Sequence, residues 1–194
     1  MAMRLAILAS GAGTTAQAVI DACAAGRIDG SVVLVVSNNA DAAVLERARC
    51  AGVAWRHISA AGEGSEESVD DALLAAARAS GATHVLLAGY LKRVGPALLA
   101  AFEGRIYNTH PALLPAFGGA GMYGDRVHAA VLASAATRSG ATVHIVTEDY
   151  DSGPIVGSVE VAVLSDDDVV SLGERVRAAE RELVVDVLAA AALD

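Results

Sequence analysis

The chain has 194 residues, enough for one domain with a sizeable buried core. Hydrophobic residues make up 54% of it and charged residues 19%, which excludes intrinsic disorder, and a net charge of −9 without any lysine/arginine run disfavours a nucleic-acid partner. No apolar run approaches the roughly 20 residues of a membrane span, and no signal peptide is recognisable, so we expect a cytoplasmic protein without membrane contact.

The first third of the chain alternates apolar runs with helical patterns. We expect strands at 5–9, 31–36 and 53–58, separated by helices at 16–25 and 41–50. Thr14 or Thr15 is expected to cap the first helix, and Gly26 and Gly52 to end the two helices. This strand–helix alternation predicts a parallel sheet with right-handed crossovers.

The remaining elements continue the same α/β pattern. A polar loop at 59–65 precedes a helix at 66–80, and Pro96 opens a short helix at 96–102. Asp166 to Asp168 favour the start of a terminal helix. The other expected elements are strands at 83–88, 105–108, 142–147 and 155–163, a glycine-rich loop at 117–124 and a helix at 125–136. The fold class is therefore α/β, a Rossmann-like, mostly parallel sheet with helices on both faces.

The first strand runs into the glycine turn Gly11-Ala12-Gly13-Thr14-Thr15-Ala16. Glycines between a strand and a helix let backbone N–H groups face a phosphate at the helix N-terminus. Dinucleotide sites also need an acidic residue at the end of the second strand, where this chain has Ser37-Asn38-Asn39. The turn therefore favours a phosphate site over a dinucleotide site; a bare tight turn is the alternative.

A second motif is Asn108-Thr109-His110-Pro111-Ala112-Leu113-Leu114-Pro115. Proline restricts its own backbone and the residue before it, so His110 should lie on a rigid extended segment at a strand end. Alternate residues of an extended segment face the same way, so Asn108 and His110 can converge on one substrate atom. An amide and an imidazole there could stabilise an oxyanion and exchange protons. A purely structural turn histidine is the alternative.

Asp151 follows the sixth expected strand, in Tyr150-Asp151-Ser152-Gly153-Pro154. It is either an ordinary turn residue or a carboxylate facing His110, in which case it should raise the pKa of that imidazole and keep it protonated. Among the other histidines, His84 and His144 are expected to be packed in strands, and His128 lies on a helix from which it could face the site. No histidine or cysteine spacing suggests a metal site.

These motifs, in this order and spacing, together with Leu87-Ala88-Gly89-Tyr90, resemble the folate-dependent phosphoribosylglycinamide formyltransferases of the formyltransferase superfamily. The resemblance covers nearly the whole chain. It implies a Rossmann-like sheet with an antiparallel C-terminal portion and transfer of a formyl group from 10-formyltetrahydrofolate to the amine of a glycinamide ribotide. It implies no metal, and small molecules as partners of a monomer or homodimer.

The resemblance also implies residue roles. Asn108 and protonated His110 stabilise the tetrahedral oxyanion, and Asp151 keeps His110 charged. The phosphate and ribotide of the acceptor fall to Gly13, Thr14, Thr15, Arg177 and Glu180. Folate binding falls to Leu91, Lys92, Arg93, Val94, Asn108, Thr147, Glu148, Asp149, Tyr150 and Asp151. A single domain, 1–194, is expected, with a phosphate and ribotide half at 1–103 and a folate-binding, catalytic half at 104–194.

Two other functions remain open from the sequence. The first is formylation of another amine, such as a sugar nucleotide, because the Asn-x-His-Pro element specifies the superfamily better than the acceptor. The second is a non-catalytic nucleotide-binding Rossmann module, against which the Asn108, His110 and Asp151 constellation argues. A tRNA formyltransferase would need a further nucleic-acid-binding domain, and an acidic chain is not expected to supply one.

Overall fold

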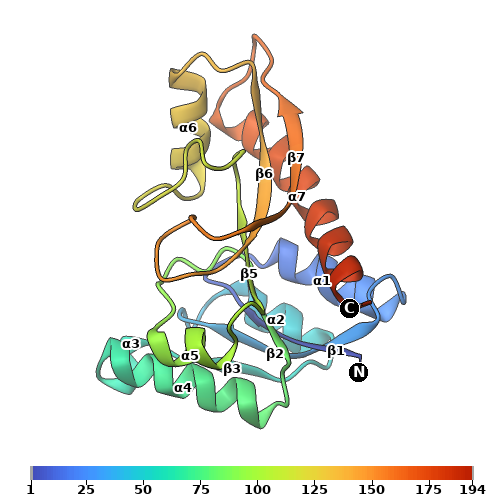
Figure 1. Ribbon diagram of the computed structural model, residues 1–194, viewed down its shortest axis with the longest axis vertical. Helices are drawn as coiled ribbons and strands as arrows, with labels where there is room; N and C mark the ends of the chain where they lie inside the picture. The colour runs from blue at the N-terminus through green and yellow to red at the C-terminus, as the bar shows by residue number, and fades with distance from the viewer. Residues whose placement is uncertain (1, 194) are drawn as a thin grey trace.

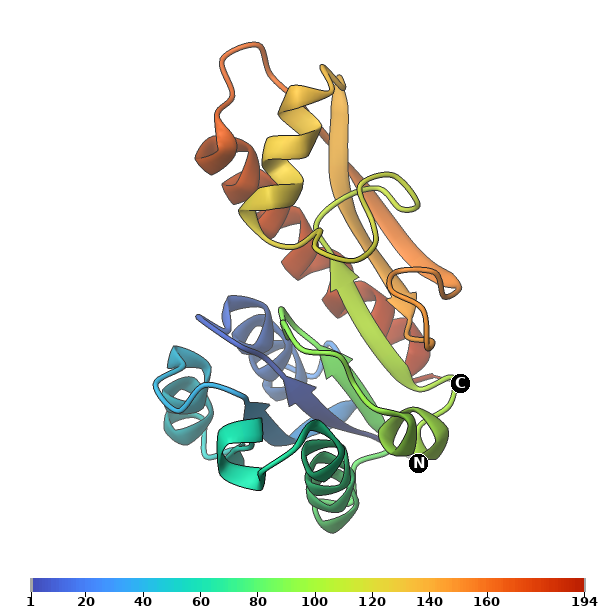
Figure 2. The ribbon, with the colours of Figure 1, turned by 90° about the vertical axis from the view of Figure 1, so that its left-hand side faces the viewer.

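The computed structural model describes residues 2–193 as one seven-stranded sheet flanked by helices on both faces (Figures 1 and 2). The elements, in chain order, are β1 (Met3–Leu8), α1 (Thr14–Ala24), β2 (Gly30–Ser37), α2 (Ala43–Cys50), β3 (Trp55–His57), α3 (Ala60–Glu63), α4 (Glu66–Ala79), β4 (His84–Leu87), α5 (Pro96–Ala101), β5 (Ile106–His110), α6 (Asp125–Ala133), β6 (Arg138–Ile145), β7 (Ile155–Ala162) and α7 (Val169–Ala191).

The sheet order is β3-β2-β1-β4-β5-β6-β7. The first five strands pair in parallel, whereas β6 is antiparallel to both β5 and β7. The order reverses beside β1, and the carboxyl ends of β1, β4 and β5 meet at one edge, where open α/β sheets bind ligands. The predicted mixed sheet, with its antiparallel C-terminal portion, is confirmed.

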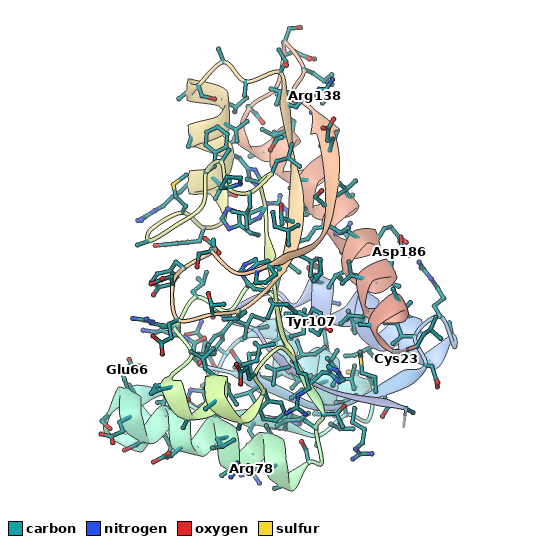
Figure 3. All side chains as sticks on the ribbon, in the orientation of Figure 1. Cys23, Glu66, Arg78, Tyr107, Arg138 and Asp186 are labelled. Atoms are coloured by element: carbon teal, nitrogen blue, oxygen red, sulfur yellow. The ribbon has the colours of Figure 1, made fainter. Side chains whose placement is uncertain are left out.

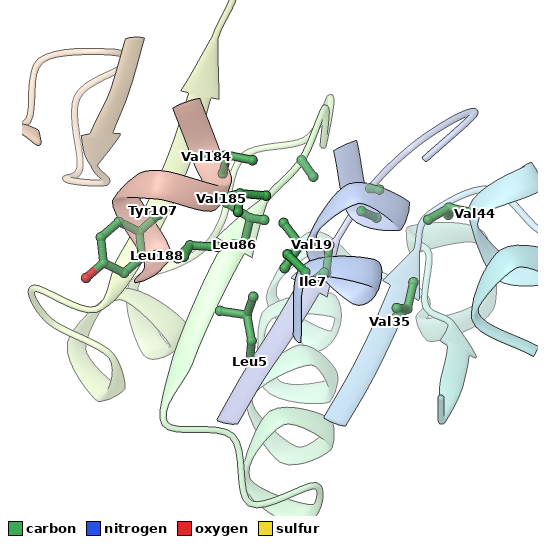
Figure 4. Close-up of a cluster of buried hydrophobic side chains, with 14 of the residues drawn as sticks. Leu5, Ile7, Val19, Val35, Val44, Leu86, Tyr107, Val184, Val185 and Leu188 are labelled. Carbon is green, nitrogen blue, oxygen red and sulfur yellow. The ribbon is translucent and has the colours of Figure 1, made fainter. Parts of the chain in front are cut away.

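The two faces of the parallel strands are buried by different helices. In β1, Leu5 and Ile7 pack toward α1 and α7, while Ala6 and Leu8 pack toward α4 and α5. Figure 4 shows the first cluster, in which Val19 of α1 and Leu188 of α7 meet the strand side chains. Because both faces are covered, these strands are continuous apolar runs, and that is why the sequence pattern located them.

The C-terminal part extends the sheet beyond β5. In Figure 1, α6, β6, β7 and the first turns of α7 form the upper part of the molecule, and α7 then runs down to α1. Val131 of α6, Ala141 of β6 and Val176 of α7 belong to one buried cluster. The Asp168 side chain accepts hydrogen bonds from Val170 N and Ser171 N, which confirms the expected acidic start of the terminal helix.

Charged side chains project from the periphery, as Glu66, Arg78, Arg138 and Asp186 do in Figure 3, while Tyr107 lies inside. No helix in the described part of the chain is long and apolar enough to cross a bilayer.

Three expectations about elements were wrong. The segment 59–65 contains the helical turn α3, because Ser59 takes an extended backbone ahead of it and Gly64 closes it with a φ of 91°. Strand β6 starts at Arg138, four residues before its expected start, because pairing with β7 extends it through polar positions. Helix α6 ends at Ala133, and Ala135 takes a left-handed backbone.

Candidate active site

A cavity of about 350 Å³ opens at the carboxyl edge of the sheet. The glycine turn after β1, the segment after β4, the end of β5, the glycine-rich loop, the loop after β6 and one side of α7 all contribute to its wall. Every residue that the sequence assigned to catalysis or to either substrate lines this cavity. Its size is in the range of small-molecule sites.

Asn108, His110 and Asp151 meet at the floor of the cavity. The Asp151 carboxylate lies between two imidazoles, with Oδ2 3.5 Å from His110 Nδ1 and Oδ1 3.4 Å from His144 Nε2. Asn108 Nδ2 lies 3.0 Å from His144 Nε2 and donates to Asp151 Oδ1 at 3.5 Å. The predicted trio is therefore one contiguous group, and His144 is its fourth member.

The register of β5 and β6 explains this group. Asn108 and His110 are two residues apart on β5, so both side chains face the same way. In the antiparallel pair β5–β6, Asn108 lies directly opposite His144. Residues in such a pair have adjacent side chains. His144 is 1% exposed, so the expectation of a packed strand histidine was right about its burial and missed its contacts.

Asp151 reaches the group from a turn in which its own φ is 53°. Asparagine and aspartate tolerate this left-handed conformation better than most residues. Burial opposes ionisation, but hydrogen bonds from His144 and from the Gly119 amide, 2.9 Å from Oδ2, outweigh it and hold the pKa of Asp151 below its usual value. Asp151 is therefore an anion at neutral pH.

His110 has a polar partner near each of its ring nitrogens. Its Nε2 lies 2.8 Å from the Phe117 carbonyl, which can only accept, so Nε2 carries a proton. Burial lowers the pKa of this imidazole, which is 3% exposed; Asp151 and the Phe117 carbonyl raise it, but the pKa remains below the ordinary value. Asp151 thus acts in the predicted direction, and burial acts against it as the larger effect.

The opposing effects of burial and Asp151 on the pKa of His110 can be tested by titration. In the unliganded protein, His110 should gain its second proton at a pH below the ordinary pKa of histidine, because burial lowers its pKa. Asp151→Asn removes the charge that raises the pKa of His110, so its midpoint should move to lower pH still. Histidine ring NMR against pH measures both, with His84, remote from the group, as the reference signal. A His110 midpoint above the ordinary value, or one raised by Asp151→Asn, contradicts the account.

The glycine turn after β1 lines the same cavity as this group. Gly13 has a φ of 70°, and a Cβ there would meet Val44 at 2.4 Å, so no larger residue fits. Gly13 itself is the N-cap of α1, and no side chain caps this helix end. The expected cap by Thr14 or Thr15 was wrong, because the left-handed glycine lets α1 begin at Thr14. Both threonines instead line the cavity at the positive end of α1.

Glu180 enters the cavity from α7. It is 8% exposed, and its Oε1 accepts from Thr15 Oγ1 at 3.2 Å and from Thr109 Oγ1 at 2.9 Å. Burial raises the pKa of Glu180, an effect that the two hydroxyl bonds only partly offset. A carboxylate held this way is suited to a cationic or hydrogen-bond-donating ligand group, whose approach favours its ionised form.

Arg177 lies one turn before Glu180 on the same helix and is 3.7 Å from Asp125 at the start of α6. His128 of α6 lines the cavity, as the sequence allowed, and its buried Nδ1 has no hydrogen-bond partner among the described residues. Burial and the neighbouring Arg177 lower the pKa of His128.

The opposite wall is formed by two segments, 91–94 after β4 and 147–151 after β6. Arg93 joins them: its Nη2 donates to the Glu148 carbonyl at 2.5 Å, and its guanidinium lies 5.8 Å from the centre of the Tyr150 ring. Leu91 and Tyr150 are exposed there, giving an apolar and aromatic wall suited to a flat ligand. No group of three or more metal-ligating side chains occurs within residues 2–193.

Comparison with known proteins identifies the family of this chain. A family model described as formyl transferase matches residues 3–188. The chain belongs to the formyl transferase family. The resemblance inferred from the motifs is thereby confirmed.

Relatives within the formyl transferase family are similar along almost the whole chain. The chloroplastic phosphoribosylglycinamide formyltransferase of Arabidopsis thaliana is 42% identical over 188 residues, which is 96% of this chain and 64% of that protein. The chain spans 60% of the Vigna unguiculata relative of the same name, so it covers less than two thirds of either plant protein. The Escherichia coli K12 phosphoribosylglycinamide formyltransferase is 35% identical over 181 residues, covering 93% of this chain and 83% of that protein.

Solved structures of formyl transferases have the same fold. Glycinamide ribonucleotide transformylase 1 from Symbiobacterium toebii matches with a TM-score of 0.94 and 40% identity, over 99% of this chain and 88% of that chain. The enzyme from Geobacillus kaustophilus matches with a TM-score of 0.92 and 34% identity, over 98% and 99% of the two chains.

Proposed function

We propose that this chain transfers the formyl group of 10-formyltetrahydrofolate to the amine of 5-phosphoribosylglycinamide, a step of de novo purine biosynthesis. The observation that carries the proposal is one cavity that holds both the glycine turn at the start of α1 and the group of Asn108, His110 and Asp151. Family membership supports formyl transfer, and the activities for which the relatives are named support this acceptor.

The acceptor is proposed to bind between α1 and α7. Its phosphate meets the backbone N–H groups of Gly13, Thr14 and Thr15 at the start of α1. Arg177 adds a cation at the same end of the cavity, and Glu180 receives the glycinamide amine through the carboxylate face that its two threonine bonds leave open. The amine is thereby held beside the end of β5.

The formyl donor is proposed to bind in the opposite wall. Segment 91–94 and segment 147–151 enclose its ring system. The two segments are joined by the guanidinium of Arg93, which lies over the ring of Tyr150. Asn108 and Asp151 belong to this subsite and to the catalytic group, so the formyl carbon lies where the two substrates meet. The donor is a co-substrate, and no step of the proposal uses a metal.

The chemistry follows from the resting charges. The amine nitrogen attacks the formyl carbon, a C–N bond forms, and the carbonyl electrons move to oxygen, where Asn108 Nδ2 donates to the oxyanion. Neutral His110 accepts the proton that the amine loses, and Asp151 stabilises the resulting imidazolium. The C–N10 bond then breaks as N10 receives that proton. The products are the glycinamide ribotide formylated on its amine nitrogen and tetrahydrofolate.

The proposal treats residues 1–194 as a single domain in which both halves build both subsites. Gly13 to Thr15 and the folate segment 91–94 belong to the half at 1–103, whereas Arg177, Glu180 and the catalytic group belong to the half at 104–194. All of these residues come from one chain, so the proposed reaction needs no second subunit, and a monomer or a homodimer can perform it.

The acceptor's phosphate provides the first test. Turnover of 10-formyltetrahydrofolate should require an amine, and kcat/KM should be about 100-fold or more higher for glycinamide ribotide than for the riboside that lacks the phosphate. Absorbance of the folate ring reports the rate. Turnover without any amine would show a hydrolase, and equal rates with ribotide and riboside would contradict the phosphate site.

A further inference from the structure

Ser10 is the last residue before the glycine turn at which the acceptor's phosphate is proposed to bind, here called the phosphate turn. Ser10 does not line the cavity, and all its polar groups are hydrogen-bonded. It is 5% exposed. Its Oγ donates to Asn38 Oδ1 at 2.6 Å and accepts from Leu91 N at 2.8 Å. Its backbone N donates to Gly89 O at 3.0 Å, and its carbonyl accepts from Asn39 Nδ2 at 2.6 Å.

These four bonds join the carboxyl ends of three neighbouring strands. Ser10 follows β1, Asn38 and Asn39 follow β2, and Gly89 and Leu91 follow β4. The chain beyond Ser10 is the phosphate turn, and Leu91 is the first residue of the proposed folate segment. One buried hydroxyl therefore lies between the two segments that line opposite walls of the cavity.

The asparagines after β2 are themselves fixed. Asn38 Nδ2 donates to Asn39 Oδ1 at 3.3 Å, and Asn39 N donates to Ser37 Oγ at 3.1 Å. They occupy the strand end at which a dinucleotide site places its acidic residue. Here the same strand end holds Ser10 instead of a ribose.

We infer that Ser10 is a positioning residue that sets the phosphate turn and the folate segment relative to each other, so that its hydroxyl supports the binding of both substrates. The inference rests on the proposed function for the identity of the two ligands. Without the hydroxyl, the Leu91 amide loses its acceptor and Asn38 loses its donor, so each segment is free to shift. Ser10 contacts no reacting atom, because it lies behind the residues that line the cavity.

Ser10→Ala tests this inference. The dissociation constants of glycinamide ribotide and of tetrahydrofolate, each measured alone by calorimetry, should both rise by about tenfold. Both KM values should rise in parallel, with kcat almost unchanged, since the lost interactions support bound substrate and transition state alike. Ser10→Thr keeps the hydroxyl and should retain most of the affinity for both ligands.

Ser139→Ala is the matched control, because Ser139 is equally buried and its hydroxyl has no partner among the described residues. It should leave both dissociation constants unchanged. If Ser10→Ala weakens only one ligand, or lowers the melting temperature with both affinities intact, the positioning role is wrong. Wild-type protein that binds both ligands but transfers no formyl group contradicts the proposed function and leaves this test decisive. Wild-type protein that binds neither ligand contradicts both.

Discussion

Asp151→Asn is expected to lower kcat by about two to four orders of magnitude without loss of the fold. The asparagine can still accept from the Gly119 amide, so the turn keeps its shape, but the negative charge between His110 and His144 is gone. The imidazolium that forms when His110 takes the amine proton then lacks its counter-ion. Single-turnover formyl transfer with both substrates saturating measures the effect, and circular dichroism checks the fold.

Asp186→Asn is the matched control, because Asp186 is exposed on α7 and pairs only with Arg27 among the described residues. It should react at the wild-type rate. His110→Ala should lower kcat to a similar extent as Asp151→Asn, and the double variant should be little worse than the poorer single variant, because the two residues act as a unit. Multiplied losses in the double variant, or an unchanged rate in Asp151→Asn, would remove the pair from the mechanism.

Glu180→Gln is expected to raise KM for the glycinamide ribotide by about 10- to 100-fold. The glutamine amide oxygen can accept from Thr15 and Thr109 as Oε1 does, so the substitution removes charge and little else. The KM for the folate should stay constant, because Glu180 lies on the α1 and α7 side of the cavity. Steady-state kinetics with each substrate varied in turn measures both values.

Glu182 lies two residues further along the same helix, is exposed and pairs with Arg27. Glu182→Gln therefore controls for the loss of one negative charge from α7. It should leave both KM values unchanged. Equal increases in both KM values for Glu180→Gln would indicate a general disturbance of the cavity and contradict the assignment of Glu180 to the acceptor.

The central parallel strands β1, β2 and β4 were predictable because helices bury both faces of the sheet there. Runs such as Leu5 to Ala9 and Val32 to Val36 are short, continuous and apolar, which is typical of central strands in a parallel sheet. The start of β6 was not predictable, because Arg138, Ser139 and Gly140 have little strand propensity and become a strand through pairing with β7. The turn α3 was hidden in the same way by its polar, glycine-containing sequence.

The site divides along similar lines. Asn108 and His110 are close in sequence, and proline chemistry marks their segment, so local reasoning located them. The contact of His144 with Asn108 depends on the β5–β6 register, which no local pattern fixes. Glu180 could be assigned only through the family resemblance, since its partners Thr15 and Thr109 are distant in the chain. The resting charge of His110 depends on burial, which a sequence does not give.

Competition between two acceptors shows whether this cavity formylates a glycinamide ribotide. The chain is given 10-formyltetrahydrofolate carrying a ¹³C-formyl group together with equal concentrations of glycinamide ribotide and an amino-sugar nucleotide, and mass spectrometry locates the label. Wild-type protein should place the label almost entirely in the ribotide, and Asp151→Asn should place almost none in either acceptor. Label accumulating in the sugar nucleotide, or released as formate, would contradict the proposed function.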